Sequence, residues 1–586
     1  MTRVGAKWQL TQCCSLARIL LLKSARSIMA NQQAVDQLLE MKVQKRKIVI
    51  IGGGFAGAFA AKYLSRFGGN EFELELVNST NYFVFQPLLP EVVSGTISAP
   101  DAVTPLRYML PGVKVRMAEV TSIDMDAQQV NLLQGSRRFP QSIEYDQLII
   151  AVGQKTDRSS QPGLAVHSLC MRDLSSAHEI RNQVIRCLEH ADITENPDVR
   201  RRLLTFVVSG GGFSGVETIG ELVEMIRRTL RFYPNISDRD IQTILIQRDD
   251  RILPELSPKL GQYAEQKLRK RNVQILLNTQ LTSVTARDVY LDNGTCLATD
   301  TLITTAGSGP RVLTTNLDLE LQRGKIAVDE FLRVPGRENV WCIGDAALIP
   351  LPSKEGADIR YAPPTAQFAV REARIVSRNI VASHNGEQMQ AFSYQPKGSL
   401  ASIGNYKAVA EIFGIRLSGL LAWLMWRGLY IGMLPGFSTR LRVALNWLFD
   451  YFLPRSIVQI ANNPETATTY RYYAAGDVIC RPGQTIDGLY TVISGAMESR
   501  IPGQEGHEDF VRILGPGDHW GERSLANDTL AVGTLTATEK TLVLVLQRSD
   551  FVALSAAFPP LQKYFDGISD ETYAPSLRGV SKKRPD

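Results

Sequence analysis

The chain has 586 residues, which is more than one hydrophobic core usually holds, so several domains are expected. Hydrophobic residues make up 44% and charged residues 21%, a balance that is typical of folded globular proteins and excludes a disordered chain. The net charge of +6 is spread along the sequence and argues against a nucleic-acid partner, and the cysteines form no CxxC pair, so neither a metal site nor a dithiol centre is predicted.

Residues 1–45 form a basic and partly apolar extension. All charged residues before Asp36 are lysines or arginines, and the apolar residues Leu20, Leu21 and Leu22 lie among them. The apolar run is short for a signal sequence and has no clear cleavage site. Three interpretations stay open: a disordered extension, which we favour, an organelle presequence, or a basic helix on a membrane surface.

A dinucleotide-binding pattern begins near Lys47. The apolar run 48–51 is typical of a strand buried on both faces, and it leads into Gly52-Gly53-Gly54-Phe55-Ala56-Gly57 and a helical stretch to about Phe67. In this GxGxxG turn the first glycine makes the tight turn, the second lets the backbone approach a pyrophosphate, and the third lets the helix pack on the strand. The helix N-terminus then presents N–H groups to the anion.

The same pattern occurs a second time. The apolar run 203–209 leads into Gly210-Gly211-Gly212-Phe213-Ser214-Gly215 and a helix that contains Glu217 and Glu221. Segments 145–153 and 302–307 are further predicted strands that end in small residues, as crossings between two nucleotide domains would. Two such units predict two bound dinucleotides with electron transfer between them.

A later segment, 339–346, contains Gly344-Asp345 and resembles the second FAD motif of flavoproteins. Together with Phe85-Gln86-Pro87-Leu88-Leu89, Gly215-Val216-Glu217 and the stretch 363–369, it makes residues 46–455 resemble the type II NADH:quinone oxidoreductases. The resemblance implies an α/β fold in which a doubly wound FAD-binding domain is interrupted by a doubly wound NAD(P)-binding domain. It also implies hydride transfer from NADH or NADPH to FAD and electron transfer to a membrane quinone, without proton pumping.

The resemblance further implies the residues of each site. The FAD site would comprise Gly52, Gly54, Phe55, Ala56, Gly57, Asn78, Val120, Ala151, Gly153, Gly344, Asp345 and Ala366. The NAD(P) site would comprise Gly210, Gly212, Phe213, Ser214, Gly215, Gln247, Arg248, Ala306 and Gly307.

Two residues are expected to take part in catalysis. Gln367 lies in the segment that resembles the family's quinone motif, where a side-chain amide can bond a quinone carbonyl. Glu217 is expected near the nicotinamide and the flavin, where it would orient the ring or handle protons; the alternative is a carboxylate on a helix surface. Because hydride transfer requires mainly stacked rings, catalysis here would consist largely of positioning.

Three positions depart from the family pattern. Asn78 stands where an acidic residue usually binds the adenosine ribose, and it would accept a hydrogen bond more weakly than a carboxylate. Gln247 replaces the acidic residue of the second unit and Arg248 follows it, so a 2′-phosphate is no longer repelled and NADPH use is open. Arg371 replaces a second glutamine in the quinone motif.

Residues 412–456 are expected to form amphipathic helices. The longest charge-free run, 428–439, is shorter than the roughly 18 residues that span a bilayer. We expect the arginines to reach anionic headgroups while Trp423, Trp426 and Trp447 enter the interface. The alternative is a helix pair packed in the core or in a homodimer interface.

From Tyr470 onward, short apolar strands alternate with glycine-rich turns, which predicts a small antiparallel β-roll. It resembles the cyclic-nucleotide-binding domain, with Gly521 and Glu522 in the phosphate cassette and the Glu on the ribose 2′-OH. The cassette's arginine falls on Ala531, and leaving a phosphate anion without that partner costs about 1.5–3 kcal/mol. We therefore expect the fold but not cyclic-nucleotide binding.

These inferences predict a peripheral membrane protein at the cytoplasmic face of the inner membrane, or on the matrix side if the extension is a presequence. Two other classes stay open: a sulfide:quinone or ferredoxin-type reductase, for which Cys170 and Cys342 would be the candidate pair, and a degenerate flavoprotein that serves as a sensor platform. The predicted domains are 1–45 (extension), 46–165 and 301–411 (FAD, the second with the quinone motif), 166–300 (NAD(P)), 412–456 (membrane helices) and 460–575 (β-roll).

Overall fold

A computed structural model describes residues 45–551, apart from 136–138, 306, 353–358, 460–467, 485, 504–507, 527–529 and 549. The extension up to residue 44 and Ala306 therefore lie outside the described residues. The chain divides into two compact units, each built from separate stretches of sequence. The first comprises Met1–Asn81, Leu110–Gly153 and Val312–Tyr394, and the second Tyr82–Met109, Gln154–Arg311 and Gln395–Asp586.

The first unit is built on a seven-stranded sheet. Its strands from β19 to β5 run parallel, and β6 and β7 continue the sheet as an antiparallel meander. Ile48, Val49 and Ile50 in the central strand are fully buried, as the apolar run predicts. In sheet order the strands are β19 (Val340–Cys342), β8 (Gln147–Ile150), β1 (Arg46–Ile51), β2 (Phe72–Asn78), β5 (Lys114–Asp124), β6 (Gln129–Gln134) and β7 (Phe139–Glu144).

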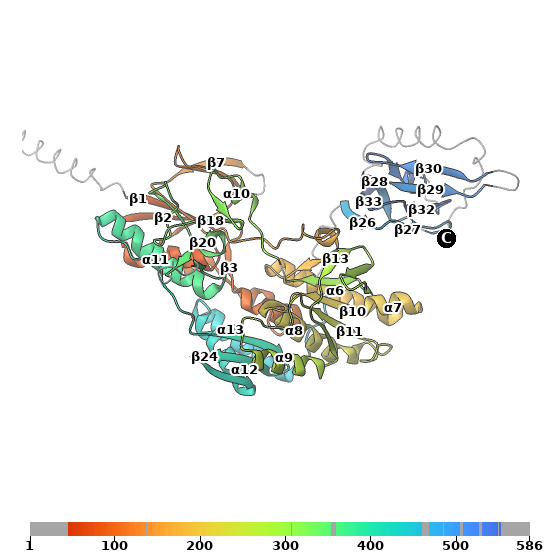
Figure 1. Ribbon diagram of the computed structural model, residues 1–586, viewed down its shortest axis with the longest axis horizontal. Helices are drawn as coiled ribbons and strands as arrows, with labels where there is room; N and C mark the ends of the chain where they lie inside the picture. The colour runs from red at the N-terminus through yellow and green to blue at the C-terminus, as the bar shows by residue number, and fades with distance from the viewer. Residues whose placement is uncertain are drawn as a thin grey trace, which may run out of the picture. The chain divides into compact units, whose positions relative to one another are not determined.

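Two long helices lie beside this sheet (Figure 1). Helix α2 (Phe55–Phe67) begins directly after the first glycine motif, and α11 (Ala366–Asn385) packs along it. The Ser377 hydroxyl of α11 donates to the Ala60 carbonyl of α2 at 3.1 Å. The unit also contains α10 (Val312–Thr315), a small sheet of β17 (Leu321–Gln322), β18 (Lys325–Ala327) and β20 (Ala347–Leu348), and the pair β21 (Pro350–Leu351) and β22 (Arg360–Tyr361).

The second unit contains a fully parallel five-stranded sheet, as the second glycine motif predicts. Its order is β12 (Val273–Leu276), β11 (Gln242–Ile246), β10 (Thr205–Ser209), β16 (Thr301–Thr304) and β9 (Leu169–Cys170). The prediction of an FAD-type domain interrupted by an NAD(P)-type domain is confirmed at the level of fold. The helices of this region are α5 (Leu164–His167), α6 (Leu174–Ile193), α7 (Pro197–Leu203), α8 (Phe213–Thr229) and α9 (Pro258–Arg269), and an antiparallel sheet follows of β13 (Leu281–Val284), β14 (Asp288–Leu291) and β15 (Cys296–Ala298).

The predicted helical region 412–456 begins as a strand. Ile415–Gly419 form β25, which pairs with β24 (Lys407–Ile412) and through it with β23 (Gly398–Gly404). Two helices follow, α12 (Leu420–Met433) and α13 (Phe437–Phe452). No helix in the described stretches is long and apolar enough to cross a bilayer. The second unit also includes β3 (Tyr82–Val84), β4 (Val103–Pro105), α3 (Leu89–Ser94) and α4 (Leu106–Met109).

The C-terminal region forms the predicted β-roll from two four-stranded antiparallel sheets. A buried apolar cluster that includes Trp520, Leu535 and Val543 makes its core. One sheet has the order β26 (Thr468–Tyr473), β33 (Thr541–Gln547), β28 (Gly488–Ser494) and β31 (His519–Trp520). The other has the order β27 (Val478–Cys480), β32 (Thr534–Ala537), β29 (Met497–Ile501) and β30 (Phe510–Leu514), and the short helix α14 (Glu522–Ala526) follows β31.

Candidate functional site: two dinucleotide loops and their partners

The first glycine loop joins β1 to α2. Gly52 has φ +109°, and a Cβ there would lie 2.3 Å from the Ala151 carbonyl oxygen of the neighbouring strand end. A Cβ on Gly57 would lie 1.9 Å from the Gly52 carbonyl oxygen. Gly54 is the N-cap of α2, no side chain caps the helix, and a Cβ there would meet nothing within 4 Å. The space beside Gly54, at the N-terminus of α2, can therefore admit a pyrophosphate.

The second FAD motif lies against the same helix end. A Cβ on Gly344 would lie 2.8 Å from the Ala56 methyl carbon in the first turn of α2. The Gly344 N–H donates to the Glu372 carboxylate at 2.7 Å. Two segments far apart in sequence thus converge on one glycine loop, as an FAD pyrophosphate site requires.

Sequence reasoning missed Glu372. It lies on the buried face of α11, where a carboxylate is unusual enough to signal a role. Burial raises the pKa of Glu372 to about 7, and the nearby Asp345 carboxylate adds to this rise while Lys325 opposes it. Burial likewise raises the pKa of Asp345, whose proximity to Lys325 works in the opposite direction. These groups hold the Gly344-Asp345 turn in place.

Both strand-end amides bind the glycine loop beside them. Asn78 Oδ1 accepts from the Gly53 N–H at 2.9 Å, and Gln247 Oε1 accepts from the Gly211 N–H at 2.7 Å. Gly53 and Gly211, the middle residues of the two Gly-Gly-Gly runs, are therefore fixed by the residues that were expected to meet the ribose. Each amide keeps an NH2 group, and these donate to Thr80 and to Asp249.

The second glycine loop repeats the geometry of the first. Gly210 has φ +111°, and a Cβ on Gly215 would lie 1.7 Å from the Gly210 carbonyl oxygen. Helix α8 begins after Gly212 with no side-chain cap and no acidic residue in its first turn, which contains Phe213 and Ser214. The end of β10 therefore offers a second helix N-terminus at which an anion would be favoured.

A cavity of about 410 Å³ opens beside this loop. Gln247 is buried at its edge, and Arg248 and Asp249 line it together with Gly210 and Gly307. Asp249 Oδ2 accepts from the Gln247 amide at 2.7 Å, and its other oxygen lies 3.5 Å from Arg248 Nε. Sequence reasoning missed Asp249. Its carboxylate lies beside Gln247, the residue that stands where the family pattern has an acidic side chain.

Glu217 is buried rather than exposed on the helix surface. One of its oxygens, Oε1, accepts from the Ser402 N–H at 3.0 Å and from the Trp426 indole N–H at 3.3 Å. Burial raises the pKa of Glu217 to about 8, and the nearby Glu91 and Glu221 carboxylates add to the rise. A carboxyl group with this pKa can hold and release a proton near neutral pH.

Gln367 lies in the first turn of α11. The Tyr394 hydroxyl donates to Gln367 Oε1 at 3.2 Å, and the Arg371 guanidinium lies 4.9 Å above the Tyr394 ring. Arg371 also donates to the Gln367 carbonyl at 3.4 Å. The structure thus brings the two predicted quinone residues together on a tyrosine that the sequence did not single out. Ala366, the first residue of α11, directly precedes this cluster.

The remaining predicted cofactor residues lie within or directly after strands of the first unit's sheet. Ala151 and Gly153 follow β8, next to the first glycine loop, and Val120 is half-buried in β5.

Cys342 is fully buried in β19, where burial raises the pKa of its thiol far above the ordinary value. A thiol held protonated in this way is unsuited to sulfide chemistry at the flavin.

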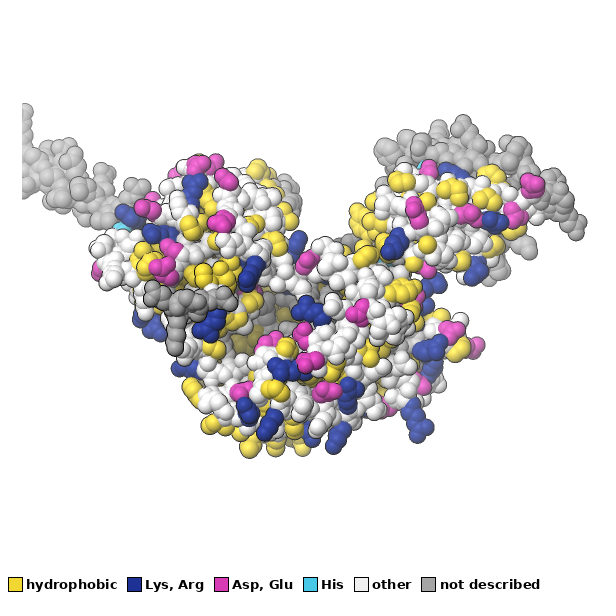
Figure 2. Space-filling view, in the orientation of Figure 1, with side chains coloured by type: hydrophobic (Ala, Val, Ile, Leu, Met, Phe, Trp, Pro, Cys, Tyr) yellow, Lys and Arg dark blue, Asp and Glu magenta, His cyan; other side chains and the backbone are white. Residues whose placement is uncertain are grey.

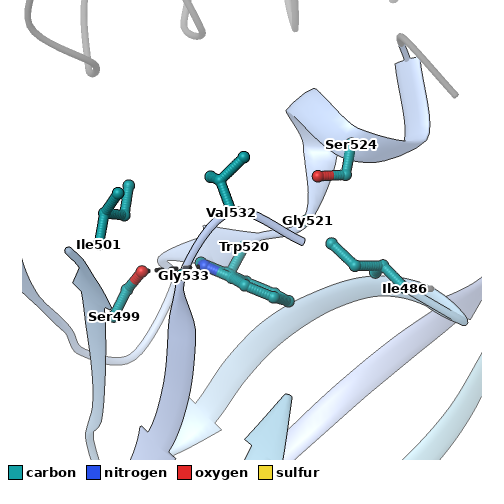
Figure 3. Close-up of a pocket in the computed structure, with 8 residues that line it drawn as sticks. All are labelled: Ile486, Ser499, Ile501, Trp520, Gly521, Ser524, Val532 and Gly533. Atoms are coloured by element: carbon teal, nitrogen blue, oxygen red, sulfur yellow. Dashed lines mark hydrogen bonds between the residues drawn. The ribbon is translucent and has the colours of Figure 1, made fainter. Parts of the chain in front are cut away.

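The C-terminal β-roll has a small pocket (Figure 3). Its cavity measures about 20 Å³, which is roughly the room of one water molecule. Trp520 lies across it and donates to the Ser499 hydroxyl at 3.0 Å, as Figure 3 shows. Glu522 is 1% exposed, and both of its carboxylate oxygens lack a hydrogen-bond partner among the described residues. The lining residues are Ile486, Ser499, Ile501, Trp520, Gly521, Ser524, Val532 and Gly533.

Comparison with known proteins agrees with this geometry. The pyridine nucleotide-disulphide oxidoreductase profile matches residues 46–373, the NDH2 C-terminal domain profile matches 397–456, and the cyclic nucleotide-binding domain profile matches 470–557. The type II NADH:quinone oxidoreductase Ndh of Mycobacterium tuberculosis is 32% identical over 70% of this chain and 89% of its own. The chain belongs to the type II NADH:quinone oxidoreductase family.

Two other proteins resemble this chain, one in sequence and one in fold. The demethylphylloquinone reductase NdbB of a Synechocystis species is 31% identical over 69% of this chain and 95% of its own. The NDH2 of Plasmodium falciparum, solved in complex with NADH, superposes with a TM-score of 0.67 at 22% identity, over 71% of this chain and all of its own. The latter likeness supports the fold.

The cavity beside Gln247 and Asp249 leads to a prediction about donor preference. Replacing Gln247 with Glu should raise the ratio of kcat/KM for NADH to kcat/KM for NADPH by about tenfold, or about 1.4 kcal/mol, because a carboxylate there repels a 2′-phosphate. Asp249→Asn should lower the same ratio, because Asp249 is the carboxylate already present at the cavity. Steady-state kinetics with both donors would measure the ratio, and an unchanged ratio in both variants would show that this strand end does not face the ribose.

Proposed function

We propose that the chain is an FAD-dependent enzyme that oxidises NADH or NADPH and reduces a membrane quinone. The observation that carries this proposal is the pair of uncapped helix N-termini, α2 and α8, each behind a glycine loop at the end of a central parallel strand. The names of the relatives, which include quinone reductases and NAD(P)H-ubiquinone oxidoreductases, support the same reaction. The alternative reductase that needs a reactive cysteine pair is disfavoured by the buried Cys342.

The residues of the first unit fit FAD. Gly52, Gly54 and Gly57 leave room for a pyrophosphate, and the Gly344-Asp345 turn lies against the same helix end. When bound, FAD would accept the donor's hydride and release electrons to the quinone. In this assignment Asp345 bonds the ribityl chain, and Asn78 orients the loop and offers its NH2 group to the adenosine.

Gln367 and Arg371 are assigned to the quinone, and Glu217 to proton handling. The Gln367 amide can bond a quinone carbonyl, and the Arg371 cation would stabilise the negative charge that develops as the quinone is reduced. Support comes from their contact with each other and with Tyr394.

The protein is assigned to a membrane surface through the outer faces of α12 and α13. Large apolar side chains there are exposed, with Leu421 at 69% and Phe437 at 79%, and Figure 2 shows hydrophobic side chains along the lower edge of the view, over α12. Attachment to one leaflet, on the cytoplasmic or matrix side, suits this surface and would give access to a membrane quinone. A homodimer interface is the alternative use of the same face.

The inner faces of these helices correct part of the sequence prediction. Trp426 and Trp447 are buried and donate to Glu217 and Glu91, so the prediction that they enter the membrane is wrong. Arg427 and Arg455 likewise pair with buried carboxylates rather than with lipid. Attraction to anionic lipid would therefore rest on the more exposed Arg416, Arg440 and Arg442.

Replacing Gln367 with Ala should slow reduction of a short-chain quinone by roughly three- to tenfold, the effect of losing one hydrogen bond. Reduction of the flavin by NADH should keep its rate, because that step does not involve the quinone carbonyl. Stopped-flow measurement of the two half-reactions distinguishes them, with the exposed Gln388→Ala as control. Equal slowing of both half-reactions would contradict the assignment.

The protein should co-sediment with anionic vesicles more than with neutral ones, and less as salt screens the charges. The double variant Leu421→Ser, Phe437→Ser should bind vesicles less at every salt concentration, because it removes exposed apolar area. Ile193→Ser, a change at an equally exposed position on α6, should leave binding unchanged. If the wild type binds neither vesicle type, the α12–α13 face is a contact between protein chains.

The β-roll is not expected to bind a cyclic nucleotide. Its cavity has the size of a water molecule and Ala531 stands in place of the phosphate-pairing arginine. Cyclic AMP or cyclic GMP should therefore leave the melting temperature unchanged, whereas NADH should raise it by stabilising the folded state. A rise in Tm that grows with cyclic-nucleotide concentration would show that the pocket opens for this ligand.

A further inference from the structure

A turn that follows β11 carries a glutamate to the second glycine loop. β11 ends at Ile246, and the chain then crosses the carboxyl edge of the parallel sheet before α9 begins at Pro258. Within this crossing the Leu256 N–H donates to the Leu253 carbonyl at 3.0 Å, which closes a β-turn over 253–256 with Pro254 and Glu255 at its tip. Proline is favoured at the first tip position because its ring presets the backbone angle that such a turn needs.

The backbone of this turn is fixed to the glycine loop and to the core. The Leu253 N–H donates to the Gly211 carbonyl at 2.8 Å, which joins the turn directly to the loop. Ile252 and Leu253 are fully buried, and Leu256 is 4% exposed. Because moving the turn would expose these apolar side chains to water, the backbone of Glu255 stays beside the loop.

The Glu255 side chain reaches the start of α8. A Cβ added to Gly212, the N-cap of this helix, would lie 3.3 Å from Glu255 Oε1. The side chain is exposed, and no hydrogen bond or ion pair holds its carboxylate among the residues that the structure describes. The neighbouring Arg251 donates instead to the Pro254 carbonyl at 3.0 Å. An unpaired negative charge therefore lies at a helix end that favours anions.

The same helix end is the place where the donor's pyrophosphate is expected. In a strand–glycine loop–helix unit, the pyrophosphate lies at the helix N-terminus, next to the glycine at which the helix begins. A carboxylate and a phosphate carry like charge and suit the same N–H groups, so they repel each other when both are present. Glu255 is therefore placed to oppose the binding of a dinucleotide.

The residues of the adjoining cavity do not offset this charge. Among the described residues that line it, Arg248 is the one cation, and its Nε lies 3.5 Å from an Asp249 carboxylate oxygen. Asp157 lines the same cavity as a further carboxylate. The proposed donor site thus has an acidic group near the expected ribose and another near the expected pyrophosphate.

We propose that Glu255 limits the affinity for NAD(P)H by repelling the donor's pyrophosphate at the start of α8. The inference rests on the proposed function, in which this site binds the donor. Since the backbone of the turn is fixed, the Glu255 side chain alone has to move toward solvent when the dinucleotide binds. The repulsion acts on NAD(P)H and NAD(P)⁺ alike, because both carry the same pyrophosphate, and it therefore speeds release of the oxidised product.

Glu255→Gln tests the repulsion in the full-length, FAD-loaded protein, because glutamine keeps the size of the side chain and removes its charge. The Kd for ADP-ribose, which has the pyrophosphate but no nicotinamide, should fall about three- to tenfold, as expected for removing one like charge about 4 Å away at a solvated site. Glu255→Lys should lower the Kd further. Adenosine, which has no phosphate, should bind the wild type and both variants equally. Isothermal titration calorimetry measures each Kd.

Salt separates a charge effect from a structural one. The difference in Kd between wild type and Glu255→Gln should shrink as salt rises to about 1 M, where the Debye length is about 3 Å. A structural role for Glu255 would leave that difference unchanged. Glu195→Gln removes an exposed carboxylate between α6 and α7, before the start of β10 rather than after its end, and is the matched control that should keep the wild-type Kd.

Stopped-flow reduction of the flavin gives an independent readout. Glu255→Gln should lower the NADH concentration that half-saturates this step and leave its limiting rate unchanged, because the pyrophosphate takes no part in hydride transfer. NADH and NADPH should gain equally, so the kcat/KM ratio between them should stay constant. This constancy distinguishes Glu255 from Gln247 and Asp249, whose replacement is expected to change the ratio.

The outcomes separate the Glu255 inference from the proposed function. A wild type that binds neither NADH nor ADP-ribose overturns the proposed function and the inference with it. A wild type that binds both, with an unchanged Kd for ADP-ribose in Glu255→Gln and Glu255→Lys, overturns the inference alone. Weaker binding of ADP-ribose by Glu255→Gln also overturns it, because Glu255 would then be a contact that holds the donor.

Discussion

The structure depends on one local constraint that occurs twice, a glycine loop that turns a central parallel strand into a helix without any side-chain cap. Gly52 and Gly210 both adopt φ values near +110°, and the next helix packs so closely that a Cβ on Gly57 or Gly215 would collide with the loop. The close packing fixes the direction of α2 and α8, and neither helix start has a side-chain cap, which leaves each N-terminus suited to an anion. The positions of the other site residues follow from these two helices.

The two loops also show how a polar side chain can change roles while keeping its place. Asn78 and Gln247 both lie at the end of a strand next to a glycine loop, and both use their side-chain oxygen to hold the middle glycine of the Gly-Gly-Gly run. At the second loop the NH2 group of Gln247 donates to Asp249, so a carboxylate lies beside the amide that replaces the family's acidic residue. In the proposed donor site, a pair of residues rather than one would therefore set the groups that a ribose meets.

Buried charge links the helices α12 and α13 to α8. Their indoles and Arg427 reach inward to Glu217 on α8 and Glu91 on α3, and Arg455, which follows α13, reaches Glu221 on α8. Large apolar side chains on the opposite faces of the two helices remain exposed. The same helices thus supply an apolar outer surface and a set of buried hydrogen-bond donors. Because an unpaired buried carboxylate is costly, these inward contacts restrain the orientation of both helices.

The sequence by itself determined the two nucleotide-binding folds, the β-roll and the paired glycine loops. Apolar runs, glycine spacing and turn residues predict these features because each depends on a short continuous stretch of chain. It could not determine which face of α12 and α13 points inward, since tryptophan and arginine suit a membrane interface and a buried ion pair equally well. It also could not reveal Glu372, Tyr394 or Glu91, whose partners lie on other elements of the fold. Only the tertiary structure decided these, because a carboxyl's burial and pKa depend on which distant residues pack around it.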